Sequence, residues 1–204
     1  MSSPGDDPKT VGGSYPGAAD TDRPVSEERI DFFVIQDYKE NRRKCTVQPL
    51  TGLEGLEIRR LGIPVPGEAL VEVPAGILLE VDAPVLTAED SVYLNGSGRL
   101  VLLDATWVRL VPLVRRLCFK GTSGLQRRSL PGDFRTAYPR QSKLFEDPAG
   151  GLASVEAMFA ATVLLGVPRK ELLRQYRWAG EFLELNREVF SRHGWEGARR
   201  EVHR

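Results

Sequence analysis

The sequence predicts an α/β protein, with an N-terminal parallel sheet followed by a helical C-terminal part. Short, almost continuous apolar runs recur up to about residue 130, separated by helix-sized pieces, and such runs are typical of parallel strands buried on both faces. Beyond about residue 130 the apolar residues recur at helical spacing instead. At 204 residues and 41% hydrophobic content, the chain can build one substantial core or two small domains that share an interface.

The first 29 residues form an acidic tail that we expect to be disordered. They contain four glycines, four prolines, four serines and six acidic residues, and their few large apolar residues show no period. We therefore divide the chain into this tail (1–29), an N-terminal α/β domain (30–128) and a helical C-terminal domain (129–204).

Three apolar runs are the expected strands, at 31–36, 77–81 and 100–103. Between the second and third runs, Thr87 followed by Glu89 and Asp90 predicts the start of a helix. A threonine cap and early acidic residues both suit the positive end of the helix dipole.

In the C-terminal part, Ser154 is expected to cap a helix that ends at Gly166. Pro168 is expected to open a second helix as a first-turn proline, and this helix should cover about 169–178. A last helix presents one apolar stripe at i, i+3 and i+7 spacing: Phe182, Leu185 and Val189.

Several classes of protein are disfavoured by what the sequence lacks. No apolar run precedes residue 30 and no stretch approaches the roughly 18 apolar residues of a membrane span, so we expect a cytoplasmic protein with no membrane partner. The absence of GxxxxGK[ST], GxGxxG, HExxH and GxSxG motifs argues against nucleotide hydrolysis, dinucleotide binding, zinc proteolysis and serine hydrolysis. Cys45 and Cys118 show no CxxC or Cys/His cluster, so we expect two reduced thiols and no metal. His193 and His203 are expected at the surface.

Positive charge is concentrated in one part of the chain, although the formal net charge is zero. Between residues 109 and 143, nine basic residues accompany a single acidic residue, Asp133, a balance of +8 that the rest of the chain offsets with −8. Such a segment can bind phosphates, because each neutralised phosphate releases counterions. A solvated surface with counterions explains the same charge equally well.

The stretch RLVLLDATW places a carboxylate directly after an apolar run that is typical of a central strand. Ligands of open parallel sheets bind outside the carboxyl ends of the strands, so Asp104 is a candidate ligand-binding residue. Alternatively, Asp104 is a turn or helix-capping residue and Trp107 belongs to the core. Because histidine chemistry has little support, an enzyme with this sequence would use carboxylates, backbone groups and a reactive cofactor.

Seven short motifs, in this order, resemble the S-adenosylmethionine-dependent aminocarboxypropyltransferases that modify small-subunit ribosomal RNA. They are RKCTVQPL, ILLEVDAPVLTAEDS, LDATW, RRSLP, YPRQSKL, ASVEAMFAA and YRWAGEFLELN, and the resemblance as a whole covers about residues 32–192. LDATW and GLASVEA also resemble the DTW-domain enzymes, which place the same group on tRNA uridine. The sequence departs from the ribosomal family at TAYPRQ, where the family's asparagines are absent, and at Ala105, where the family has cysteine.

This resemblance implies a SPOUT-like fold with a deep trefoil knot and a cofactor between the sheet and the helical part. It implies transfer of the 3-amino-3-carboxypropyl group of S-adenosyl-L-methionine to N3 of a uridine or pseudouridine, with release of 5′-methylthioadenosine. The expected partner is rRNA in ribosome biogenesis, on the pre-ribosomal small subunit, or alternatively tRNA.

The resemblance also implies roles for individual residues. Asp104 would lie near the sulfonium or the uridine N3, as a general base or as an orienting group, and Trp107 would pack on the methyl group and the cationic sulfur. Thr46 would hold the methionine carboxylate. Further cofactor contacts would come from Leu79, Leu103, Leu130, Tyr138 and Ser154. Within the basic segment, RNA would be bound by Arg115, Arg116, Lys120, Arg127 and Arg128.

Two other functions fit the same sequence. A methyltransferase of the same knotted fold would transfer the methyl carbon and release S-adenosylhomocysteine. A non-catalytic RNA-binding or ribosome-assembly factor would bind RNA through the same arginines without affinity for the cofactor. Because the sequence shows no long exposed apolar stripe, we expect a monomer.

Overall fold

The computed structural model describes residues 29–119, 124–139 and 151–197, together with Met1. Nearly all of the predicted acidic tail, Lys120 and His203 lie outside the described residues. At the centre is a five-stranded sheet of order β2-β1-β5-β4-β7, in which all four neighbouring pairs are parallel. The predicted α/β class with a parallel sheet is therefore confirmed. The strands are β1 (Phe32–Gln36), β2 (Leu56–Arg60), β4 (Gly76–Leu79), β5 (Arg99–Asp104) and β7 (Leu125–Arg128), and a separate pair is formed by β3 (Val71–Glu72) and β6 (Leu117–Cys118).

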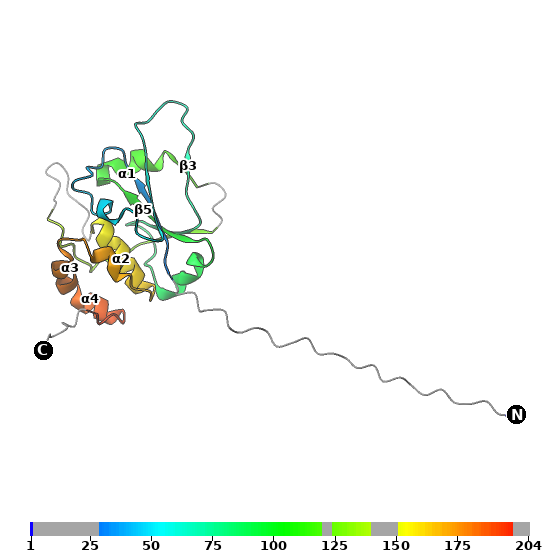
Figure 1. Ribbon diagram of the computed structural model, residues 1–204, viewed down its shortest axis with the longest axis vertical. Helices are drawn as coiled ribbons and strands as arrows, with labels where there is room; N and C mark the ends of the chain where they lie inside the picture. The colour runs from blue at the N-terminus through cyan, green and yellow to red at the C-terminus, as the bar shows by residue number, and fades with distance from the viewer. Residues whose placement is uncertain (2–28, 120–123, 140–150, 198–204) are drawn as a thin grey trace.

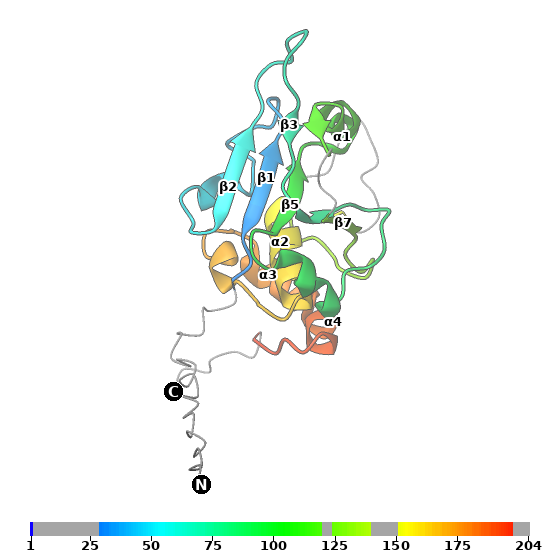
Figure 2. The same cartoon turned by 90° about the vertical axis from the view of Figure 1, so that its right-hand side faces the viewer.

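Figure 2 shows β2, β1 and β5 side by side and running in one direction, with α1 near their carboxyl ends. Figure 1 shows α2, α3 and α4 grouped together in the lower part of the view, apart from α1. Within the described residues, the α-helices are α1 (Trp107–Val114), α2 (Ser154–Leu164), α3 (Ala179–Leu185) and α4 (Arg187–Arg192), and the 3₁₀ helices are η1 (Gln48–Leu50), η2 (Ala88–Leu94) and η3 (Lys170–Leu173). Thr87 is the N-cap of η2, so the predicted helix start is confirmed.

The inner strands of the sheet, β1, β4 and β5, are buried on both faces, which explains the continuous apolar runs. In β1, Phe32 and Val34 pack with α2, α3 and α4, whereas Phe33 and Ile35 pack with Leu113 of α1 on the opposite face. We call these the α2 face and the α1 face. Because successive side chains of a strand point to opposite faces, a strand buried between two layers has no polar alternation.

Two of the predicted C-terminal helices are wrong in extent. In place of a helix over 169–178, only the short η3 forms, and Pro168 lies before it instead of opening it. The reason is that Arg169 is buried and donates to the backbone oxygens of Ile30 and Glu54, at 2.8 and 2.9 Å, so the chain is drawn towards the start of the sheet.

The predicted last helix is divided into α3 and α4 at Asn186. The Asn186 side chain is fully buried and exchanges hydrogen bonds with the backbone N–H and C=O of Arg135, at 2.7 and 2.8 Å. The stripe is therefore interrupted: Phe182 and Val189 are buried, but Leu185 is 51% exposed.

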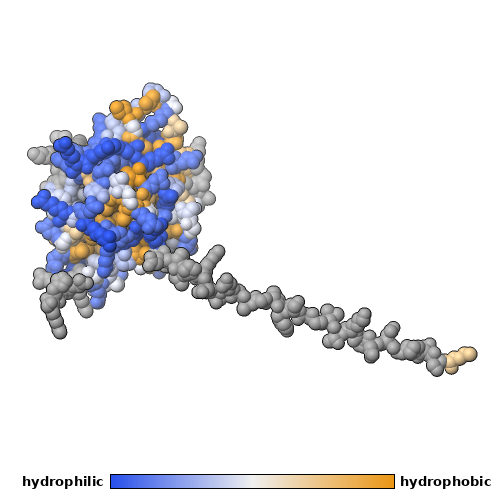
Figure 3. Space-filling model, viewed as in Figure 1, coloured by the Kyte–Doolittle hydropathy of each residue, from blue (hydrophilic) through white to orange (hydrophobic). Residues whose placement is uncertain are grey.

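Apolar side chains are exposed on the loop that follows β2. Ile63, Val65 and Leu70 are 74%, 63% and 53% exposed, and Figure 3 shows orange side chains at the protruding top of the molecule, where Figure 1 draws this loop. The expectation of a monomer is based on the absence of a long exposed apolar stripe; these exposed residues are confined to one loop, and the monomer stays a prediction. Among the described residues, no helix is long and apolar enough to cross a membrane.

Candidate functional site

The candidate site lies at the carboxyl ends of the two central strands. In the register of β1 with β5, Gln36 pairs with Asp104, so their side chains leave the sheet next to one another. The strand order places β1 and β5 where the chain turns from one half of the sheet to the other, and this is the position at which open α/β sheets bind ligands. Asp104 therefore lies at the edge where the sequence places it.

The carboxylate of Asp104 is 7% exposed and is held by three neutral donors. Ser154 Oγ donates to Oδ1 at 2.6 Å, while Gln36 Nε2 and Cys45 Sγ donate to Oδ2 at 2.8 and 3.2 Å. Asp104 is the last residue of β5 and Thr106 is the N-cap of α1, so the turn or capping role that we considered for Asp104 is wrong. The carboxylate is a buried, oriented group.

Ser154 is brought to Asp104 by the first turn of α2. The prediction that Ser154 caps this helix is wrong, because Ala153 is the N-cap and Ser154 is the first helical residue. Its hydroxyl is directed to Asp104 instead of to a backbone N–H. The predicted end is confirmed, since Gly166 has φ +80° just beyond Leu165, the C-cap.

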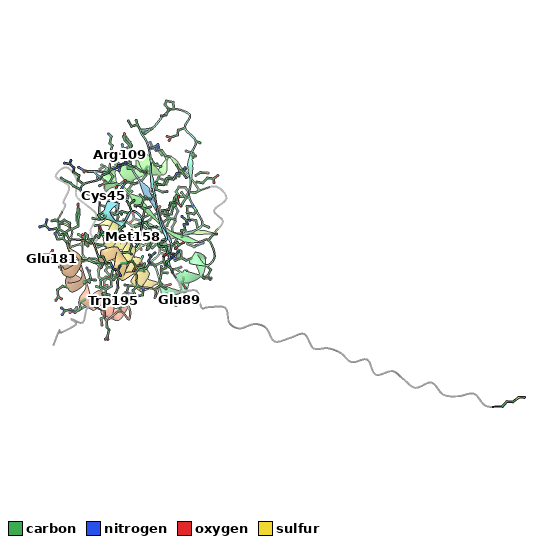
Figure 4. The ribbon with its side chains drawn as sticks, in the orientation of Figure 1. Cys45, Glu89, Arg109, Met158, Glu181 and Trp195 are labelled. Carbon is green, nitrogen blue, oxygen red and sulfur yellow. The ribbon has the colours of Figure 1, made fainter. Side chains whose placement is uncertain are left out.

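Cys45 is a buried free thiol that takes part in the same cluster. Burial, followed by the negative charge of Asp104 and the hydrogen bond to it, raises the pKa of Cys45 to about 12. The thiol is therefore a donor to the carboxylate and not a nucleophile. Figure 4 labels Cys45 and Arg109 towards the upper end of the molecule, with Met158 of α2 beneath them.

We expect Cys45 to resist alkylation by iodoacetamide in the folded protein at pH 9, whereas the half-buried Cys118 reacts. Because folding raises the pKa of Cys45, its contribution to stability is present below its ordinary value of 9.0 and is lost as the pH rises towards 12. Mass spectrometry of alkylated peptides gives the readout, and unfolded protein is the control in which both thiols react. Rapid labelling of Cys45 in the folded protein would contradict the buried donor role.

Thr46 lies against the amino-terminal end of α2. Its Oγ1 accepts a hydrogen bond from the backbone N–H of Val155 at 3.3 Å, which satisfies one of the free donors at the positive end of the helix. A hydroxyl that accepts in this way still has its own proton to donate. Thr46 can therefore donate to an anionic group at this end of α2.

Glu156 is a fully buried carboxylate that sequence reasoning did not identify. It accepts from the hydroxyl of Thr136 at 2.6 Å, from the hydroxyl of Tyr176 at 2.8 Å, and from the backbone N–H groups of Ala137 and Ala153, both at 2.9 Å. Burial, followed by the negative charge of Glu156, raises the pKa of Tyr176. Glu156 thus fixes the segment that leads to Tyr138 against the start of α2.

The predicted apolar contacts are divided between the two faces of the sheet. Leu79, Leu130 and Tyr138 are half-buried and pack on the α2 face, which Asp104 and its partner Ser154 share, whereas Leu103 packs on the α1 face. The Tyr138 hydroxyl also donates to the backbone oxygen of Lys44, at 2.7 Å.

Trp107 is the first residue of α1 and is half-buried. Within the described part of the chain it belongs to neither core cluster, so its alternative assignment to the core is wrong.

Of the six residues of the basic segment that are basic and that the structure describes, four form ion pairs with acidic residues from elsewhere in the chain. Arg116 pairs with Glu68, Arg127 with Glu80, and Arg128 with Asp90. Arg115 is exposed and has no acidic partner in an ion pair with a described residue. Exposed cations also occur beside the site, on the loop between β1 and η1: Lys39, Arg42, Arg43 and Lys44.

A separate recess, of about 730 Å³, lies away from this cluster. It is formed by α3, α4 and the preceding Asp133–Arg135 segment, and is lined by ion-paired side chains such as Glu184 with Arg187. None of the residues that line this recess belongs to the sheet or to the cluster around Asp104. We therefore place the candidate site at Asp104, where the buried polar groups converge.

No protein-family model and no curated protein matches the chain. Among solved structures, it is similar to the SAM-dependent rRNA:acp-transferase Tsr3 from Vulcanisaeta distributa, with 25% sequence identity and a TM-score of 0.57. The similarity covers 85% of this chain and 89% of that chain. The two proteins therefore share most of their fold.

Proposed function

We propose that this protein transfers the 3-amino-3-carboxypropyl group of S-adenosyl-L-methionine to N3 of a uridine or pseudouridine in rRNA, and releases 5′-methylthioadenosine. The observation that carries the proposal is a buried, oriented carboxylate at the ligand-binding edge of the sheet, in a chain that resembles Tsr3 over 85% of its length. With this function we also propose the SPOUT-like trefoil knot and the domain division at residues 128 and 129.

The residues at this edge suit S-adenosylmethionine chemically. Thr46 would donate to the methionine carboxylate near the positive end of α2. Half-buried apolar surface for the adenosine would come from Leu79 and Leu130 on the α2 face, with Tyr138 and Ser154 beside them. Because the Leu103 side chain packs on the α1 face, Leu103 would contribute through its backbone at the carboxyl end of β5. When bound, S-adenosylmethionine supplies a carbon that its sulfonium activates for displacement.

Residues of the chain would orient the uridine and accept its N3 proton. Asp104 would accept or orient the N3 proton of the uridine, held in place by Ser154, Gln36 and Cys45. Arg115 and the exposed cations of the loop before η1 would contact phosphates of the RNA, because they have no acidic partner in an ion pair with a described residue. Arg116, Arg127 and Arg128 would contribute only if RNA displaces their carboxylates.

The test is transfer of radioactive label from S-adenosylmethionine to small-subunit rRNA, with tRNA as a parallel substrate. Label in the carboxyl carbon should enter the rRNA, label in the methyl group should not, and 5′-methylthioadenosine should accumulate. Methyl label in RNA together with S-adenosylhomocysteine would replace the proposal by methyl transfer. Binding of RNA without any product would leave an RNA-binding factor, and label in tRNA alone would change the target.

Replacing Trp107 by alanine should weaken the binding of S-adenosylmethionine by roughly 2- to 30-fold, because an aromatic face on a cation contributes about 0.5–2 kcal/mol. Calorimetric titration provides the measurement. Affinity for 5′-methylthioadenosine, which carries no sulfonium charge, should fall less. Val108→Ala, at the exposed next position of α1, is the matched control and should bind normally. Equal affinity of the Trp107 variant and the wild type would remove Trp107 from the site.

A further inference from the structure

Arg60 and Gln36 form a chain of hydrogen bonds that ends on Asp104. Arg60 Nη1 donates to Gln36 Oε1 at 2.5 Å, and Gln36 Nε2 donates to Asp104 Oδ2 at 2.8 Å. The same Nε2 donates to Cys45 Sγ at 3.1 Å. The chain therefore crosses three neighbouring strands, from β2 at the edge of the sheet through β1 to β5.

Arg60 fixes the orientation of the Gln36 amide. Gln36 is only 1% exposed, so water cannot form the hydrogen bonds that a reversed side-chain amide would lose. If the amide were reversed, its NH₂ group would meet the guanidinium donors and its oxygen would meet the carboxylate of Asp104. With Arg60 in place, only one orientation satisfies every group.

The guanidinium of Arg60 forms hydrogen bonds with neutral acceptors. Besides Gln36, these are the backbone oxygens of Tyr38 and Glu40, at 2.7 and 2.8 Å. No described carboxylate forms an ion pair with Arg60, in contrast to Arg109, which pairs with Asp37 near the same edge. A charged donor strengthens the hydrogen bond to Gln36 and polarises the amide towards Asp104.

We propose that Arg60 and Gln36 are positioning residues for Asp104 in the transfer reaction. Asp104 Oδ2 accepts from both Gln36 and Cys45, whereas Oδ1 accepts from Ser154. Because each carboxylate oxygen has room for about two donors, Oδ1 keeps one position for the N–H of the base. The inference rests on the proposed function, and Arg60 acts through Gln36 without touching the substrate.

The first test compares Arg60→Met and Arg60→Lys with Arg59→Met, which removes the exposed neighbour on the same strand. In the label-transfer assay, Arg60→Met should lower kcat by about tenfold or more and leave KM for S-adenosylmethionine within about twofold, because misplacing a catalytic group mainly affects the rate. Arg60→Lys should recover part of the rate, since an ammonium can reach Gln36 but lacks the planar fork. Arg59→Met should behave as wild type.

A second variant removes the contact from the side of Gln36. Gln36→Glu keeps the acceptor for Arg60 and adds an ion pair, but it replaces the donor to Asp104 and Cys45 by a second carboxylate oxygen. Because two buried carboxylates at this distance repel one another, we expect a lower thermal midpoint. In the folded variant, assayed well below that midpoint, we expect a loss of kcat as large as that of Arg60→Met. Wild-type kcat in folded Gln36→Glu and in Arg60→Met would overturn the inference.

A third measurement does not depend on activity. The side-chain amide signals of Gln36 in a ¹H–¹⁵N spectrum, assigned by their loss in Gln36→Glu, should exchange slowly with water in the wild type and in Arg59→Met, and faster in Arg60→Met. Slow exchange in Arg60→Met would overturn the positioning contact whatever the activity. If the contact is observed but the wild type transfers no label, the proposed function fails and the contact between Arg60 and Gln36 stands.

Discussion

Asp104→Asn should lower the rate of aminocarboxypropyl transfer by about a hundredfold or more and leave the affinity for S-adenosylmethionine nearly unchanged. The amide has the shape of the carboxylate and can keep its contacts: its oxygen accepts from Gln36 and Cys45, and its NH₂ group donates to Ser154 Oγ. The variant loses the negative charge and the place for the N3 proton. Acid–base catalysis typically contributes about 10²–10⁴-fold to a rate.

Single-turnover transfer and calorimetric binding, measured on the same preparation, check this expectation. Ser154→Ala is the matched control, because it removes one donor to Asp104 but keeps the charge. It should reduce transfer by less than Asp104→Asn does, since it disturbs the position of the carboxylate and keeps the acceptor itself. If Asp104→Asn retains the wild-type rate, Asp104 is not the general base, and its role is limited to stabilising the fold at the carboxyl ends of the central strands.

The central strands could be predicted from the sequence, whereas the outer strands could not. β1 and β5 lie in the middle of the sheet and their side chains are almost all buried, so each is a continuous apolar run. β2 and β7 are edge strands that carry charged side chains, including Arg59 and Arg127. A strand with only one neighbour has no need of the apolar pattern by which we identified the others.

The C-terminal helices were mispredicted at buried polar residues. Periodicity treats a polar residue as a position on the solvent face, but Arg169 and Asn186 are 5% and 0% exposed. Each satisfies backbone groups of a segment far away in the sequence, Ile30 in one case and Arg135 in the other. Tertiary hydrogen bonds of this kind end or divide helices and leave no local signal.

The site shows the same limit. Asp104 could be identified because a carboxylate at the end of a central strand is visible in a short stretch of sequence. Its partner Gln36 lies 68 residues away, and only the register of β1 with β5 brings the two together. The charge pattern misled for a related reason, since Glu80 and Asp90 are separated from Arg127 and Arg128 along the chain but paired with them in space.

Glu156→Ala should reduce the free energy of unfolding by about 3–5 kcal/mol, because it removes the shared acceptor of four donors, of which only Thr136 is exposed. Urea unfolding provides the measurement, and Glu181→Ala, at an exposed position of α3, is the control that should change it by less than about 0.5 kcal/mol. Tyr176→Phe removes one of the donors and should cost only about 1 kcal/mol.

Since Glu156 also fixes the segment before Tyr138 against the start of α2, its loss should weaken the binding of S-adenosylmethionine even where the protein is still folded. A stable Glu156→Ala variant with unchanged binding would mean that water replaces the carboxylate, and that the segment before Tyr138 is held by its apolar contacts alone.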